Sequence, residues 1–248
     1  MAVKGSSTAA RVLTVLEAIA AHQPIGVAAL ARMMSEDKSA VQRAIVTLAD
    51  QGWIKASDEP VVRWILTPRI LAVAHSSQNK DDFQHRAQLV LDQLAAQSGE
   101  TAIYTSLEGR NLVLTLTAES GQALRMVPHT GALVPINISA TGRAVLSWLS
   151  PERMTDLLGE VPDAELRVQL QHYRTEGYAL SAEVNTRAMT LASAVFEVDG
   201  RPIGGVGITG PVERMTPDAL PRLGRLVSQA ARLLSRGEPR DKAVDLGL

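Results

Sequence analysis

The segment from Lys38 to Gln51 has the spacing of a helix with one apolar face and one polar face. At about 100° per residue, Val41, Ile45 and Leu48 fall on the same side and predict the buried face. The opposite side carries Ser39, Gln42, Arg43 and Val46. Arginine can donate two hydrogen bonds to guanine, and glutamine can pair with adenine. This face is therefore suited to contact base edges in the major groove of DNA.

Two further groups could hold phosphate beside this face. Lys38 and Ser39 begin the helix, where free backbone N–H groups favour an anion. Arg63 lies in a predicted hairpin farther along the chain, where a wing would meet the DNA backbone or the minor groove. A polar stripe taken alone more often marks a solvated helix face. The order of the surrounding elements decides between these two interpretations.

The elements around this helix follow the order of a winged helix-turn-helix. A first helix begins near Ser7, with Ser7 or Thr8 as its N-cap, and Pro24 ends it because proline cannot continue a helix. A short helix, the helix discussed above and a hairpin follow, over residues 27–34, 38–51 and 53–66. The sequence predicts this domain for residues 1–67 and a linker helix for residues 68–81.

A second domain is predicted over residues 82–236, with a tail at 237–248 that we expect to be flexible. The predicted helices cover residues 82–98, 139–149, a segment opening at Pro151, 163–176 and 217–235. The predicted strands cover residues 101–107, 112–118, 122–127, 195–198 and 202–209. Short links predict antiparallel neighbours, and Asp199-Gly200 predicts a type I′ turn between the last two strands. The fold class is α+β with two domains.

Composition excludes several kinds of site. The 248 residues include no cysteine, which excludes disulfides, thiolate metal sites and cysteine nucleophiles. The net charge is −1, and residues 1–69 carry eight Lys and Arg against six Asp and Glu, so the basic bias of this segment is mild. No stretch approaches the ~20 apolar residues that span a bilayer, and the first ten residues contain no apolar signal core. We expect a cytoplasmic protein that contacts no membrane.

Other chemical motifs are weak. Residues 205–210 match the dinucleotide pattern G-x-G-x-x-G, but this segment is predicted as strand, where the motif needs a turn and a helix. The histidines lack metal-ligand spacing, and His129, which precedes a predicted pocket, is expected at the surface. No G-x-S-x-G nucleophile elbow is present. We therefore expect no enzyme activity, no metal and no cofactor.

The chain resembles the IclR family of transcription regulators. In the first domain the resemblance is carried by residues 10–13, 15–17, 29–31, 38–39, Arg43, Leu48, 52–54 and 66–69. In the second domain it is carried by residues 133–135, 142–146, 177–179, 195–196, 199–200 and 210–211. The resemblance implies that the first domain binds DNA, for which Lys38, Ser39, Gln42, Arg43 and Arg63 are the candidate contacts that the helix and the hairpin provide. It implies a GAF-like second domain, with helices on a curved antiparallel sheet around a small-ligand cavity.

The same resemblance places the effector-binding residues. The positions that match the family's ligand site are Ala140, Thr141, Ser181, Thr190, Gly207 and Thr209. We expect a small organic or aromatic acid there, with Met126 and Met189 as adaptable lining. Small residues such as Gly142 and Gly205 either leave room for this ligand or only allow close packing of a helix on the sheet. Both interpretations stay open from the sequence.

The sequence departs from the family beside the DNA-facing helix. Asp37, preceded by Glu36, stands where the family often has proline. Two carboxylates there would repel phosphate, unless Asp37 accepts hydrogen bonds as the N-cap of the helix. We expect Asp37 to be this cap, because its side chain can accept from the N–H groups of the first turn.

Assembly follows from the DNA-binding interpretation. One winged domain makes few base contacts, so we expect a homodimer on a palindromic operator in double-stranded DNA, with a tetramer as a further association. The candidate dimer contacts are the apolar face of the first helix and, in the linker, Ile70, Leu71, Val73 and Ala74. The tetramer would form through the second domains. The sign of regulation, repression or activation, is left open. The alternative function is a small-molecule sensor or enzyme-like module whose first domain serves only for assembly.

Overall fold

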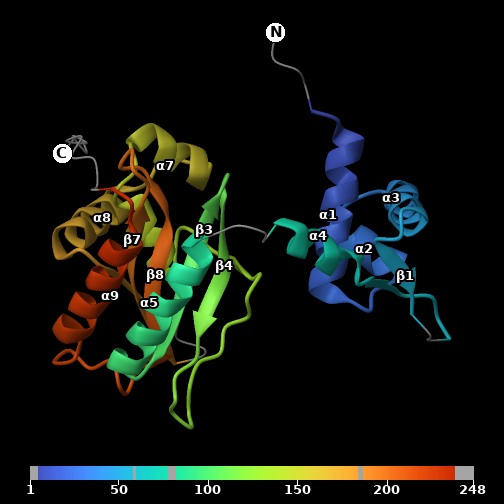
Figure 1. The fold of residues 1–248 in the computed structure, drawn as a ribbon. Coiled ribbons are helices and arrows are strands. Elements are labelled where there is room, and N and C mark those ends of the chain that lie inside the picture. Colours follow the sequence, from blue (N-terminus) through green and yellow to red (C-terminus); the bar gives the residue numbers. More distant parts are fainter. Residues whose placement is uncertain (1–4, 58–59, 78–81, 184–186, 238–248) are drawn as a thin grey trace. The chain divides into compact units, whose positions relative to one another are not determined.

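The structure is a computed structural model that describes residues 5–57, 60–77, 82–183 and 187–237. The chain divides into two compact units, residues 1–80 and residues 81–248, which are called here the N-terminal and C-terminal units (Figure 1). Each unit has its own hydrophobic core.

Helices α1, α2 and α3 form most of the N-terminal unit. They cover Ser7–His22, Val27–Met33 and Lys38–Asp50. Helix α1 is capped by Ser6, whose side chain accepts from the Ala9 amide, so the predicted caps Ser7 and Thr8 are wrong by one or two residues. Gly52 follows α3 with a φ of +72°, the left-handed conformation that ends a helix most easily at glycine.

The core of this unit lies where the three helices meet. Val15 and Ile19 of α1 pack with Leu30 of α2 and with Val41 and Ile45 of α3. Strands β1 (Ile54–Ala56) and β2 (Trp64–Leu66) pair antiparallel and complete the wing. The unit is the winged helix-turn-helix that the sequence predicts. Helix α4 (Arg69–Ser77) follows β2.

The C-terminal unit is built on one antiparallel sheet with the strand order β5-β4-β3-β8-β7-β6. The strands cover Thr101–Glu108 (β3), Asn111–Ala118 (β4), Leu133–Val134 (β5), Ala179–Glu183 (β6), Ala188–Phe196 (β7) and Pro202–Pro211 (β8). The central pairs are β3 with β8 and β8 with β7. This α+β architecture agrees with the predicted fold class.

Helices cover both faces of this sheet. Helices α5 (Asp82–Ser98) and α9 (Leu220–Leu234) pack against each other and against one face (Figure 1). Helix α6 (Ala140–Leu146) packs on β6, β7 and β8, and α7 (Pro151–Leu158) and α8 (Ala164–Glu176) share a core with it. Alternation along β7 explains the two layers, because Leu191 packs with α5 and α9 whereas Ala192 packs with α6.

The strand predicted at residues 122–127 is wrong. This segment is irregular, and the short strand β5 pairs with β4 instead. Side chains hold the segment across the end of the sheet: Thr101 donates to the Met126 carbonyl at 2.6 Å and Arg214 to the Leu124 carbonyl at 3.1 Å. Arg214 also forms a two-pronged ion pair with the buried Glu100, with Nε–Oε1 at 2.5 Å and Nη2–Oε2 at 2.6 Å.

Several other elements differ from the sequence predictions. The sequence predictions did not include β6 or the first part of β7. Helix α6 ends at Leu146 and α9 begins at Leu220, so both are shorter than predicted. The prediction of a type I′ turn at Asp199-Gly200 is wrong. The Gly200 amide donates to the Glu197 carbonyl, and of the two residues Gly200 alone has a positive φ. A type I′ turn needs a positive φ at both central residues.

The described helices include none that is long and apolar enough to cross a membrane. The predicted flexible tail, apart from Gly237, lies outside the described residues.

Candidate functional site

Helix α3 presents the polar face that the sequence predicts. Val41, Ala44, Ile45 and Leu48 are buried in the core of the N-terminal unit. The candidate DNA contacts Lys38, Ser39, Gln42 and Arg43 are all exposed. One helix face thus anchors α3 in its unit and leaves the opposite face available to a partner.

The start of α3 is held by a network of hydrogen bonds. Asp37 is the N-cap and accepts from the amides of Ser39 at 2.8 Å and Ala40 at 3.2 Å, as well as from the Ser39 hydroxyl. The hydroxyl bond and these amide bonds hold the pKa of Asp37 below its ordinary value. Arg43 Nη1 in turn donates to Ser39 Oγ at 3.4 Å. The Asp37 carboxylate therefore serves as a cap, as predicted.

The second carboxylate is also compensated. Glu36 Oε2 lies 3.1 Å from Nε of Arg11 on α1, in a partly exposed ion pair. This pairing offsets the negative charge that would otherwise oppose phosphate at the start of α3.

The wing contributes two exposed cations. Arg63 Nη1 donates to the Pro24 carbonyl at 3.4 Å, so this side chain lies against the segment that joins α1 to α2. Lys55 on β1 is exposed and was missed by the sequence reasoning, although its alternation with the buried Ile54 could have indicated it. Arg69 has a structural role, because its guanidinium lies 5.0 Å from the centre of the Trp53 ring.

In the C-terminal unit, a cavity of about 230 Å³ lies on the α6 side of the sheet. Five of the six candidate effector residues line it: Ala140, Thr141, Ser181, Thr190 and Thr209. Gly207 is not one of the lining residues, and a Cβ atom at this position would lie 2.3 Å from the Leu191 carbonyl oxygen of β7.

Three hydroxyl side chains form a row across neighbouring strands of this cavity. Ser181 of β6 pairs with Thr190 of β7, which pairs with Thr209 of β8. Thr190 and Thr209 are joined by a hydrogen bond of 3.1 Å between their hydroxyls. Ser181 accepts from the Ala140 amide at 3.1 Å and keeps its own hydroxyl proton for another acceptor. None of the described residues that line the cavity is charged.

The rest of the lining, apart from Ser139, Ala140 and Thr141, is apolar, and the sequence predicted little of it. It consists of Ile103, Leu114, Met126, Val127, Pro128, Val134 and Ala188. Met126 lines the cavity, as predicted. The prediction that Met189 lines it is wrong, because the Met189 side chain packs on the core beneath α5 and α9. Strand alternation is the signal that was missed, since Met189 and the lining residue Thr190 are neighbours in β7 and so face opposite sides.

The glycines near the cavity serve packing. A Cβ atom at Gly142 would lie 2.1 Å from the Ile136 carbonyl oxygen, and one at Gly205 would touch Thr141 of α6 at 3.3 Å. Of the small residues considered, only Ala140 lines the cavity. Close packing is therefore the interpretation that the structure supports: Gly142 packs on Ile136, Gly205 on Thr141 of α6, and Gly207 on Leu191 and Ala192 of β7.

The weaker motifs carry no site in the structure. Residues 205–210 lie within β8, with no helix at the motif, so a dinucleotide has no cradle there. His129 is exposed and does not line the cavity. Within the part of the chain that the structure describes, no group of His, Asp and Glu could hold a metal ion.

Family models match both units. Residues 8–58 match the IclR helix-turn-helix domain, and residues 75–236 match the C-terminal domain of bacterial IclR transcriptional regulators. The chain belongs to the IclR family. Members of this family are transcriptional regulators with an N-terminal DNA-binding domain and a C-terminal ligand-binding domain, and this chain has both domains.

Relatives and solved structures agree with this assignment. The chain is 29% identical to the HTH-type transcriptional regulator BhcR of Paracoccus denitrificans, over 92% of this chain and 85% of that protein. It is 25% identical to the transcriptional repressor IclR of Escherichia coli, over 90% and 86%. The fold matches an IclR-family regulator from Brucella abortus with a TM-score of 0.78 at 18% identity, over 93% and 92% of the two chains.

Proposed function

We propose that this protein recognises a palindromic operator by placing α3 in the major groove. Gln42 and Arg43 contact base edges, Lys38 and Ser39 contact phosphate, and Arg63 approaches the backbone or minor groove from the wing. The observation that carries this proposal is the polar, exposed face of α3 opposite its buried core face. The protein acts as a regulator and not as an enzyme, in keeping with the names of its relatives.

The effector in this proposal is a small organic or aromatic acid. Its carboxylate accepts hydrogen bonds from the hydroxyls of Ser181, Thr209 and Thr141, while its carbon skeleton meets the apolar lining residues. A volume of about 230 Å³ lies below the ~300–1,000 Å³ that is typical of sites for drug-sized ligands, which suits a small acid. No cation lines the cavity among the described residues, so hydroxyls and backbone amides supply the donors.

The proposed assembly is a homodimer, with a tetramer as a further association. Two winged domains on one two-fold axis contact two half-sites about one helical turn apart. Leu71 on α4 is 59% exposed, which makes this helix the proposed dimer contact. A second copy would cover this side chain.

A mobility-shift assay and footprinting on the DNA upstream of the protein's own coding region test this function. Binding should give a symmetric footprint and weaken steeply between 50 and 200 mM salt, since phosphate contacts release counterions. A panel of carboxylates from acetate to benzoate should then change that binding. Failure to bind any upstream fragment more tightly than random DNA would contradict the proposal.

A further inference from the structure

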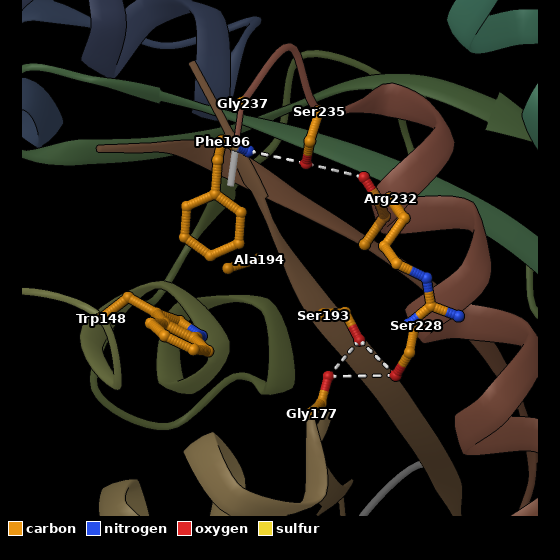
Figure 2. Close-up of a pocket in the computed structure, with 10 residues that line it drawn as sticks. Trp148, Gly177, Ser193, Ala194, Phe196, Ser228, Arg232, Ser235 and Gly237 are labelled. Atoms are coloured by element: carbon orange, nitrogen blue, oxygen red, sulfur yellow. Dashed lines mark hydrogen bonds between the residues drawn. The ribbon is translucent and has the colours of Figure 1, made fainter. Parts of the chain in front are cut away.

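We propose that the C-terminal unit has a second small-molecule site, distinct from the effector cavity, that takes a small aromatic carboxylate. The site is a cavity of about 230 Å³ between Trp148, the end of β7 and the last turns of α9 (Figure 2). It is as large as the effector cavity. The two cavities have no lining residue in common.

The cavity exists because β6 covers only part of β7. Their pairing ends at Ala179 and Ala192, so the rest of β7 forms an open edge. The Phe196 amide on this edge donates to Ser235 Oγ at 3.0 Å, and the Phe196 carbonyl accepts from the Arg236 amide at 2.9 Å. Backbone groups two residues apart in a strand point to the same side, so Ala194 directs its amide and carbonyl toward the same edge.

Two hydroxyls supply polar contacts on one side of the cavity. Ser193 Oγ and Ser228 Oγ both lie within hydrogen-bond distance of the Gly177 carbonyl, at 2.6 and 3.1 Å (Figure 2). The two oxygens are 3.3 Å apart. Since each hydroxyl has one proton and two lone pairs, two hydroxyls that donate to one carbonyl keep free lone pairs, which can accept from a water that bridges to the carboxylate.

Aromatic rings supply the apolar surface. Trp148 and Phe196 meet edge to face, with ring centres 5.3 Å apart and an interplanar angle of 85°. Both rings line the cavity, together with the methyl groups of Ala194 and Ala231. A third ring of similar size can extend such a cluster favourably.

Positive charge indicates a carboxylate. Arg232 lines the cavity, is exposed, and forms no ion pair among the described residues. Arg174 is not one of the lining residues, but its guanidinium lies 4.6 Å from the centre of the Trp148 ring. The nearby carboxylate of Glu197 is paired with another arginine, since its Oε1 lies 3.9 Å from Nη1 of Arg236. This ion pair does not neutralise the charge of Arg232. Guanidinium groups bind planar carboxylates through two parallel hydrogen bonds.

The same two elements line both cavities. Helix α6 begins with Ala140 and Thr141 at the effector cavity, and Trp148 follows its last turn at the second cavity. Strand β7 carries Thr190 at the first and Ser193 at the second. A ligand that orders α6 and β7 from the second cavity therefore changes the free energy of binding at the first.

Benzoate binding to the full chain tests the proposal. Trp148 is the single tryptophan outside the N-terminal unit, so its emission should change on titration, and Trp148→Phe should abolish that change. Saturation-transfer NMR of benzoate gives a second readout that does not depend on fluorescence. Arg232→Gln should weaken binding about tenfold, as expected for a lost charged hydrogen bond. Benzamide, which has the same ring without the charge, should bind more weakly and should not respond to Arg232→Gln.

Two variants serve as controls. Arg225→Gln removes the same charge from an exposed position of α9 that does not line the cavity, and it should bind benzoate like the unaltered chain. Thr190→Val removes a hydroxyl from the effector cavity, and in this variant benzoate should still change the Trp148 emission. The proposal is overturned if benzoate binding does not depend on Arg232, if Arg225→Gln has the same effect, or if Thr190→Val abolishes the response. The proposal is also overturned if benzoate binds a truncated chain that ends at Gly237 but does not bind the full chain.

Discussion

The guanidinium of Arg43 donates a hydrogen bond to the hydroxyl of Ser39, one helical turn earlier on the exposed face of α3. The Ser39 hydroxyl is itself bonded to the Asp37 carboxylate. Arg43 is thus oriented by its own helix before any DNA is present. A side chain ordered in advance loses less conformational entropy when it binds.

The first prediction concerns base recognition by Arg43. Arg43→Ala should weaken specific binding by about 1–3 kcal/mol and relax selectivity at one base pair of each half-site. The measurement is a mobility-shift titration on the operator and on its single-base variants. Equal loss of affinity on every sequence would assign Arg43 to phosphate instead.

The second prediction separates phosphate contacts from base contacts. Lys38→Ala should weaken binding to all sequences alike and reduce the slope of log K against log salt by about one. Titrations at four salt concentrations, on operator and random DNA, measure both effects. An unchanged slope would exclude Lys38 from the interface.

The third prediction concerns the cap of α3. Asp37→Ala should lower the melting temperature at pH 7, because the first-turn amides of Ser39 and Ala40 lose their acceptor. The folded pKa of Asp37 lies below its ordinary value of 3.8, so the stabilisation is complete above 3.8 and is lost as pH falls through the folded value. The gap in melting temperature between the two proteins should therefore close below pH 3.8. A gap independent of pH would mean that charge has no part in the cap.

The fourth prediction concerns the hydroxyl row of the effector cavity. Thr190→Val keeps the side-chain shape and removes the hydroxyl that donates to Thr209. The Thr209 hydroxyl then loses the bond that orients it toward the effector, so effector binding should weaken roughly two- to tenfold. The readout is the rise in melting temperature given by the carboxylate that stabilises the unaltered protein most. Thr105→Val is the matched control, because Thr105 is buried and donates to the Gly205 carbonyl at 3.3 Å without lining the cavity. Equal losses in both variants would indicate a general effect on the sheet.

The fifth prediction concerns self-association through α4. Leu71→Glu should weaken the dimer by more than about tenfold, since an unpaired carboxylate is costly to bury. Light scattering over a dilution series measures the effect. Val198→Glu places the same charge at a 73% exposed apolar position of the C-terminal unit and should leave the dimer intact. A dimer unaffected by Leu71→Glu would place the interface elsewhere.

The sequence predicted those parts of the molecule whose signals are local. The period of Val41, Ile45 and Leu48 defined the buried face of α3, and Asp37 was predicted as its cap from residue type alone. Strand β6 and the first part of β7 were missed because their residues, such as Ala179 and Ala192, are small and give weak alternation. The irregular segment 122–127 depends on long-range bonds from Thr101 and Arg214, which no local pattern contains.

The candidate cavity was predictable in its polar half only. Ser181, Thr190 and Thr209 were found through resemblance, whereas Ile103 and Val134 belong to strands brought together by the fold. Gly207 matches a family position but does not line the cavity, and its lack of a side chain allows β8 to approach Leu191 of β7 closely. Contact between distant strands is set by register, and register cannot be obtained from one segment at a time.

The row of Ser181, Thr190 and Thr209 has a consequence for engineering. Each hydroxyl comes from a different strand, while backbone pairing maintains the sheet beneath them. Exchanges among serine, threonine, cysteine and valine at these three positions therefore vary the chemistry of the cavity with little change in volume. A combinatorial library of a few dozen variants would sample this chemistry, and coupling it to a reporter gene would turn the scaffold into a family of biosensors for small acids.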